Sequence, residues 1–75
     1  MNNSIKNFII NEKKTIKDAF VKIDKNTLGI IFIVDKNNKV IGCATDGDIR
    51  TKLLKGFNLK DQISICMNRN FKYST

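Results

Sequence analysis

Apolar residues in the first third of the chain form a short run and then a helical stripe. The run 8–10 suits a strand or an extended arm, and the polar residues 11–14 follow it as a turn. The stripe comes next: Ile16, Ala19, Phe20 and Ile23. Its spacing of i, i+3, i+4 and i+7 predicts a helix with one apolar face. Thr15, with Asp18 three residues later, predicts a capping box at the start of this helix.

The middle of the chain predicts a β-hairpin. Residues 30–34 are apolar at every position and rich in β-branched side chains, which suits a strand covered on both faces. Residues 35–39 are polar, and Asn37 and Asn38 tolerate the positive φ angles that tight turns need. Residues 40–44 form the returning strand, so two antiparallel strands follow the first helix.

A second helix is predicted directly after the returning strand. Thr45 or Asp46 caps it, and Gly56 after Lys55 fits a helix end at a left-handed glycine. Three apolar residues of this helix are expected to face inward: Ile49, Leu53 and Leu54. The order of elements is therefore β-α-β-β-α.

The pattern after Gly56 is less regular. Leu59, Ile63 and Met67 have the spacing of a short helical turn, and residues 71–73 resemble the beginning of another strand. Because the chain stops where a new element opens, we expect it to have been cut from something longer.

Length and composition restrict the class of protein. Seventy-five residues make one small domain, and such a chain buries only about 60% of its unfolded surface, so its core is marginal. Cys43 and Cys66 are expected to stay free thiols in a reducing compartment, with Cys43 as a small buried residue. No signal peptide and no apolar stretch of membrane-spanning length is found, so we expect a cytoplasmic protein without a membrane partner.

The net charge is strongly positive. The chain carries 14 Lys and Arg against 7 Asp and Glu, a formal charge of +7, which favours anionic partners such as nucleic acids. All these cations except Arg50 and Arg69 are Lys, however, and they are scattered over predicted helices and turns alike. We therefore expect no nucleic-acid partner.

Candidate chemistry gathers where the returning strand meets the second helix, in Gly42–Arg50 (GCATDGDIR). Such a corner presents backbone N–H groups, the Thr45 hydroxyl and the Asp48 carboxylate together. A phosphate can sit on the amides and a ribose on the carboxylate. A purely structural alternative is open, because Thr45 at the N-cap with Asp48 at N3 is a second capping box.

A catalytic role is not expected. The chain has no His, which removes the commonest general base and most transition-metal sites. Glu12 is the only glutamate, and no activated nucleophile is found. We therefore expect no catalytic residue, no metal and no cofactor.

Four segments, in this order, resemble a cystathionine-β-synthase (CBS) domain repeat: Thr15–Ala19, Ile31–Asp35, Val40–Gly42 and Thr45–Arg50. The resemblance predicts a single repeat in residues 8–67 and the start of a following element or linker in residues 68–75. It implies an α+β fold with a three-stranded sheet and two helices on one face. The Thr-Asp-Gly-Asp-Ile-Arg version is most similar to repeats fused to bacterial sugar-phosphate isomerases and sugar nucleotidyltransferases.

The resemblance also implies a ligand. Repeats of this family are non-catalytic and pair sheet against sheet, and their cleft takes an adenine nucleotide such as AMP, ADP, ATP or S-adenosylmethionine. By this resemblance Asp48 matches the acid that binds the ribose hydroxyls, and Thr45 the hydroxyl near ribose and phosphate. The remaining matched positions are Gly29, Ile30 and Phe32 around the base and Thr15 on the phosphate side.

The chain holds only one repeat, so an apolar face of its sheet needs a partner. We expect two chains to supply the missing half to each other as a homodimer. The function implied is a regulatory module that senses an adenine nucleotide for a fused or partner enzyme. The alternative is an oligomerisation or interaction module, without ligand, of a larger sugar-nucleotide enzyme.

Overall fold

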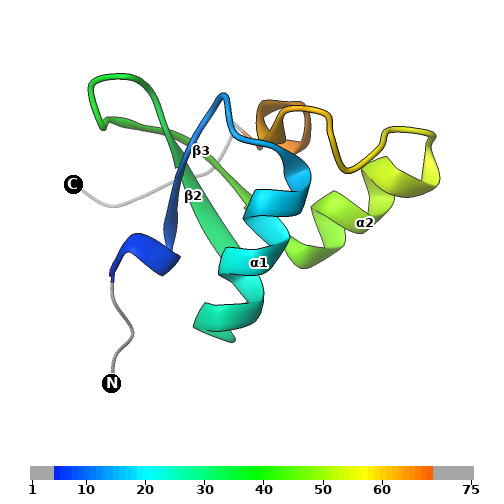
Figure 1. Ribbon diagram of the computed structural model, residues 1–75, viewed down its shortest axis with the longest axis horizontal. Coiled ribbons are helices and arrows are strands. Elements are labelled where there is room, and N and C mark those ends of the chain that lie inside the picture. Colours follow the sequence, from blue (N-terminus) through cyan, green and yellow to red (C-terminus); the bar gives the residue numbers. More distant parts are fainter. Residues whose placement is uncertain (1–4, 69–75) are drawn as a thin grey trace.

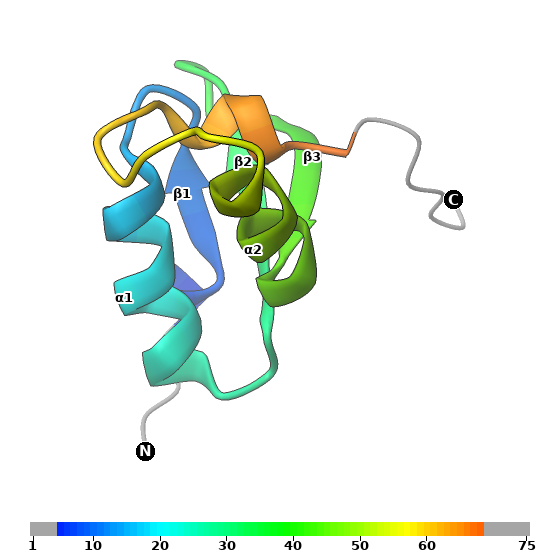
Figure 2. The same cartoon turned by 90° about the vertical axis from the view of Figure 1, so that its right-hand side faces the viewer.

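A three-stranded sheet carries both helices on one of its faces (Figures 1 and 2). The computed structural model describes residues 5–68. The elements are, in chain order, η1 (Ile5–Asn7), β1 (Ile9–Asn11), α1 (Ile16–Asn26), β2 (Ile30–Val34), β3 (Val40–Thr45), α2 (Asp46–Leu54) and η2 (Ile63–Cys66), where η marks a 3-10 turn. The expected α+β class and β-α-β-β-α order are confirmed.

The sheet has the order β1-β2-β3. β1 runs parallel to β2, with Ile9 opposite Phe32, and β2 runs antiparallel to β3, with Ile31 opposite Ala44. Two parallel neighbours need a crossover, and α1 provides it. The β2–β3 pair is the predicted hairpin.

The hairpin turn is fixed by backbone geometry and by one carboxylate. Asn38 adopts the positive φ expected there, at 63°. Asp35 Oδ1 accepts hydrogen bonds from the backbone N–H groups of Asn37 (2.8 Å) and Lys39 (3.1 Å). These hydrogen bonds, from Lys39 first and Asn37 second, lower the pKa of the Asp35 carboxyl below its ordinary value.

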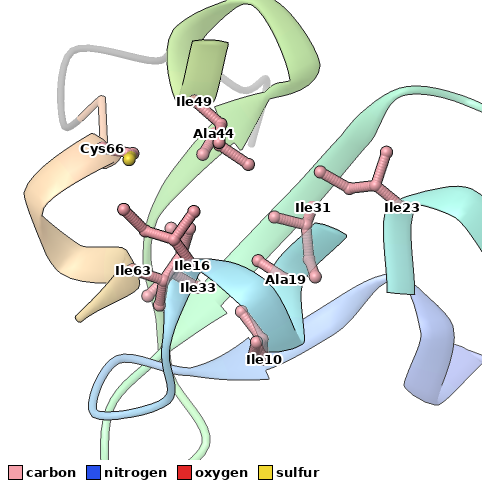
Figure 3. Packing of buried hydrophobic residues seen from close by; sticks show 10 residues of the cluster. All are labelled: Ile10, Ile16, Ala19, Ile23, Ile31, Ile33, Ala44, Ile49, Ile63 and Cys66. Carbon is pink, nitrogen blue, oxygen red and sulfur yellow. The ribbon is translucent and has the colours of Figure 1, made fainter. Parts of the chain in front are cut away.

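The core lies between the helices and the inner face of the sheet (Figure 3). It is built from ten buried side chains: Ile10, Ile16, Ala19, Ile23, Ile31, Ile33, Ala44, Ile49, Ile63 and Cys66. The predicted helical stripe supplies three of these, and Phe20 packs against them from the margin. Burying one such isoleucine side chain contributes about 1.5–3 kcal/mol, so this cluster carries the fold.

The two faces of β2 differ, contrary to the expectation of a strand covered on both sides. Ile31 and Ile33 are fully buried beneath the helices. Ile30 and Phe32 alternate with them and are only half-buried. Within one chain, the outer face of the sheet therefore keeps apolar side chains in contact with solvent.

The inward orientation expected for Leu54 is wrong. Its side chain is 89% exposed, whereas Ile49 is fully buried and Leu53 packs against the core. At 100° per residue, Leu54 lies about 140° around the helix from Ile49 and Leu53 only about 40°. A leucine at the end of a short helix therefore points away from the sheet.

After α2 the chain returns over the core in η2, which buries Ile63 and Cys66. Leu59 is 42% exposed and does not join this turn, although the spacing of apolar residues suggested that it does. Asn68 pairs with Cys43, its N–H donating to the Cys43 carbonyl at 2.7 Å. The strand expected at residues 71–73 lies outside the described residues. No helix within residues 5–68 is long and apolar enough to cross a membrane.

Candidate functional site

The end of β3 and the start of α2 form the predicted corner around Thr45 and Asp48. Thr45 keeps extended backbone angles, φ −103° and ψ 166°, and is the N-cap of α2. Its Oγ1 accepts a hydrogen bond from the Asp48 N–H at 3.1 Å, and Asp48 Oδ2 accepts one from the Thr45 N–H at 3.0 Å. The capping-box interpretation is therefore confirmed, and any ligand role comes in addition to it.

Gly29 and Ile30 lie next to this corner. The Cα of Ile30 is paired with Thr45 across the sheet, and the Gly29 carbonyl accepts a hydrogen bond from the Asp46 N–H at 2.9 Å. Gly29 has φ +75°, a conformation that L side chains rarely adopt. A Cβ built there has no heavy atom within 4 Å, so the glycine is needed for its backbone angles and leaves open space.

Phe32 extends the site along the outer face of the sheet. It lies two residues after Ile30 on the same face of β2, and it is paired with Cys43 on β3. An apolar strip therefore starts at the polar corner and continues between the two strands. A flat apolar surface next to a carboxylate and a hydroxyl suits a molecule with an aromatic ring at one end and hydroxyls at the other.

Asp48 is the charged side chain at the polar end of this strip that can bind such a molecule. It is half-buried, and its Oδ2 is held by the cap, whereas no described residue donates a hydrogen bond to its Oδ1. The neighbouring Asp46 is already paired with Arg50, Oδ2 to Nε at 3.1 Å. The corner therefore offers one oriented carboxylate oxygen as an acceptor.

Thr15 does not join the other predicted site residues. It caps α1 with the same capping box, in which its Oγ1 accepts from the Asp18 N–H at 3.2 Å. It follows β1, whose last residue Asn11 is opposite Val34, whereas Thr45 is opposite Ile30 at the other end of β2. These two ends of β2 are about 13 Å apart. The part expected for Thr15 on the phosphate side stays a prediction.

The two thiols lie near Asp48 and show no sign of activation. Both are free, Cys66 in the core and Cys43 half-buried on the outer face rather than buried as expected. Burial, and then the negative charge of Asp48, raise the pKa of the Cys43 thiol. Burial is also the main cause of the raised pKa of Cys66. Both thiols are thereby kept protonated, opposite to what a nucleophile needs. Within residues 5–68, no group of three or more His, Cys, Asp or Glu side chains could hold a metal ion.

One residue that shapes the site has no sequence signal. Asn26, at the end of α1, is 2% exposed. Its Nδ2 donates to the carbonyls of Asn7 (2.8 Å) and Ile30 (3.0 Å), and its Oδ1 accepts from the Leu28 N–H (2.9 Å). Asn26 therefore fixes the start of β2 at the corner. In sequence it is one of several polar residues at a helix end, and only the three-dimensional contacts distinguish it.

A second missed contact lies on β3. Gly42 is buried, and a Cβ added to it would overlap the Cγ of Met67 and come within 2.6 Å of its Sδ. Met67 and Asn68 therefore cover β3 because Gly42 has no side chain. A glycine within a predicted strand was the available signal, since such residues mark close approaches.

Comparison with known proteins identifies related sequences and folds. A family model described as "CBS domain" matches residues 3–55. An uncharacterized protein of Helicobacter pylori is 34% identical over 55 residues, which are 73% of this chain and 17% of that protein. The arabinose 5-phosphate isomerase KdsD of Salmonella typhi is 33% identical over 51 residues, 68% of this chain and 16% of that enzyme. The chain thus spans only a small part of the curated relatives that it matches.

Solved structures share the fold at low sequence identity. The CBS domain protein PAE2072 of Pyrobaculum aerophilum, complexed with AMP, superimposes with a TM-score of 0.75 at 17% identity, covering 81% of this chain and 48% of that one. An uncharacterized conserved protein of Pyrococcus horikoshii gives a TM-score of 0.81 at 16% identity, covering 89% of this chain and 52% of that one. In both cases the chain corresponds to about half of the neighbour.

Proposed function

The chain belongs to the CBS domain family, and on this premise we propose that it is a non-catalytic, cytoplasmic regulatory module that binds an adenine nucleotide. The observation that carries the proposal is the arrangement of Thr45, Asp48 and Gly29 at one end of the apolar strip of Ile30 and Phe32. A nucleoside has the matching parts, a flat base and a ribose with two hydroxyls.

The ribose is the part that suits Asp48. Its Oδ1 faces no donor among the described residues and can accept a hydrogen bond from a ribose hydroxyl. The same negative charge repels a phosphate, although the N-terminus of α2 attracts anions. In this proposal the phosphate therefore points away from Asp48, while the base lies on Phe32.

Pairing of two chains completes the cleft in this proposal. Half-buried side chains lie on the outer face of the sheet: Ile30, Phe32 and Cys43. A second sheet packed about 10 Å away covers such a face. A two-fold axis makes the contact self-complementary and brings the two corners into one assembly.

The relatives suggest which enzyme is regulated. Two Salmonella relatives are named arabinose 5-phosphate isomerase, and the matched segment is 16% of one and 12% of the other. We propose that this repeat likewise serves a sugar-phosphate or sugar-nucleotide enzyme, either fused to it or as a partner. The AMP complex of the Pyrobaculum protein supports an adenine nucleotide as the ligand class.

The two capping boxes provide a matched test of the nucleotide site. Asp48→Ala and Asp18→Ala each remove the side chain at N3 of a capping box, and we expect similar losses of stability of about 1 kcal/mol. Only Asp48→Ala is expected to abolish binding of AMP, ADP, ATP or S-adenosylmethionine, measured by calorimetry and thermal shift. Equal nucleotide binding by both variants would contradict the ribose role of Asp48.

A ligand-free oligomerisation module is the second candidate. The observation in its favour is that Thr45 and Asp48 form the same box as Thr15 and Asp18, which needs no ligand to explain it. This candidate predicts a folded dimer whose melting temperature does not respond to any of the four nucleotides at millimolar concentration.

A further inference from the structure

A basic groove lies along α1 and η1, the turn that leads into the edge strand β1. Its volume is about 460 Å³. Its charged lining residues are four lysines and one acid: Lys6, Lys14, Lys22, Lys25 and Asp18. The uncharged residues Asn7 and Val21 complete the lining. Four lysines and one aspartate give the groove a formal net charge of +3.

No ion pair within residues 5–68 neutralises the positive charge of this groove. The ion pair of the described residues is Arg50 with Asp46, far from the groove in the sequence, and no groove lysine has a carboxylate oxygen within 4.0 Å. Lys22 instead donates from Nζ to the backbone carbonyl of Lys6 at 2.7 Å, which holds one ammonium group against η1. Asp18, the acid in the lining, is occupied at its Oδ2 by the capping box. Like charges gathered in this way favour an acidic partner.

The adjacent edge of β1 offers backbone groups to the same partner. β1 bonds to β2 through the Phe8 carbonyl (2.8 Å from Phe32 N) and the Glu12 N–H (2.9 Å from Val34 O). By strand alternation the N–H and carbonyl of Ile9 face the edge of the sheet where no strand of residues 5–68 pairs with β1. Such an edge can accept an additional extended strand.

We propose that this groove and the β1 edge together bind an acidic, extended segment of another protein. The lysines attract the carboxylates, the Ile9 backbone pairs with the segment, and Val21, 48% exposed, contacts an apolar residue between the acids. A nucleic acid fits less well, because the lining holds no arginine and no aromatic ring on which a base could stack. The site is separate from the Thr45–Asp48 corner, so it does not depend on the nucleotide proposal.

Peptide binding to the full chain tests this proposal. The probe is a capped peptide of alternating Glu and Val, with a Gln-Val peptide as the uncharged control, followed by fluorescence anisotropy and amide NMR shifts. We expect the acidic peptide to shift the amide NMR signals of Ile9 and of residues around Lys22. Added salt is expected to weaken the binding of this peptide. The Gln-Val peptide is expected to bind at least about tenfold more weakly.

Charge reversal locates the site. The double variant Lys22→Glu with Lys25→Glu is expected to lower the affinity for the acidic peptide at least about tenfold. The control pair is Lys36→Glu with Lys60→Glu, both exposed and outside the groove, and it is expected to change this affinity less than about twofold. If the first variant does not fold, Lys6→Gln with Lys25→Gln replaces it. Equal effects of both pairs, or no shift at Ile9, would overturn the proposal. Tighter binding of a single-stranded oligothymidylate, lost with the same groove lysines, would overturn it in favour of a nucleic acid.

Discussion

At the scale of single residues, Asn26 connects three parts of the chain that meet behind the corner. Its amide satisfies the carbonyls of Asn7 and Ile30 and the N–H of Leu28. All the buried side-chain polar atoms of the described residues have a hydrogen-bond partner. The loss of this one amide would take a hydrogen-bond partner from each of these three backbone groups.

Asn26→Ala is expected to lower the free energy of unfolding by about 2–3 kcal/mol, because buried backbone groups lose their partners. Asn26→Asp is expected to be at least as harmful, since a carboxylate cannot donate to the two carbonyls. Urea unfolding measures both. Asn37→Ala, at an exposed position, is the control and should change stability by less than about 0.5 kcal/mol. A small effect of Asn26→Ala would show that water replaces the amide.

The residues of the two helix caps could be predicted from the sequence, and Asn26 could not. Thr45 and Asp48 are hydrogen-bonded within four consecutive residues, so their separation in the sequence is enough to predict the capping box. Asn26 bonds to Asn7, nineteen residues earlier, and a contact of that range leaves no local pattern. Thr15 lies apart from the corner within one chain because strand direction decides which ends of the elements meet, and its part on the phosphate side stays a prediction.

At the scale of elements, strands were predicted more accurately than the surroundings of α2. β2 and β3 follow from their apolar runs and from the polar turn between them. In α2 the identity of Leu54 suggested burial, but its angular position decides its exposure. A short helix contacts the sheet along one narrow line, so one residue of offset moves a side chain from core to solvent.

Two glycines of the β3–α2 unit are expected to respond oppositely to alanine. Gly42→Ala places a Cβ against Met67 and 3.1 Å from the Asn68 carbonyl, so we expect loss of stability and faster amide exchange at Cys43 and Asn68. Gly47→Ala meets only Thr45 Oγ1, at 3.8 Å, and lies inside α2. It is expected to stabilise by about 0.5 kcal/mol, because glycine loses more backbone entropy in a helix.

Thermal unfolding and hydrogen exchange measure this pair of variants. Destabilisation by both would contradict the open space around Gly47. An unchanged exchange rate at Asn68 in Gly42→Ala would show that the Met67 side chain moves aside without releasing the segment that it belongs to.

At the scale of the whole molecule, the two faces of the sheet differ in how well they are covered. The helices cover the inner face, and the outer face with its apolar strip is partly open to solvent. The inner face buries Ile31 and Ile33 completely (Figure 3). The outer face leaves Ile30 and Phe32 half-exposed. The uniformly apolar sequence of β2 is typical of a strand covered on both faces. The outer face of β2 is more exposed in a single chain than its apolar sequence predicts. A second sheet that covers the outer face would explain this difference.

Phe32→Glu is therefore expected to convert a dimer into a monomer. A two-fold contact brings both copies of the substituted position into the same interface, where the new carboxylates lose water and repel each other. Leu54→Glu is the matched control, because Leu54 is 89% exposed on the helical side. Light scattering after size exclusion should show a dimer for the parent chain and the control, and a folded monomer for Phe32→Glu. A parent chain that is monomeric at micromolar concentration would contradict sheet-to-sheet pairing and leave the apolar strip without its proposed cover.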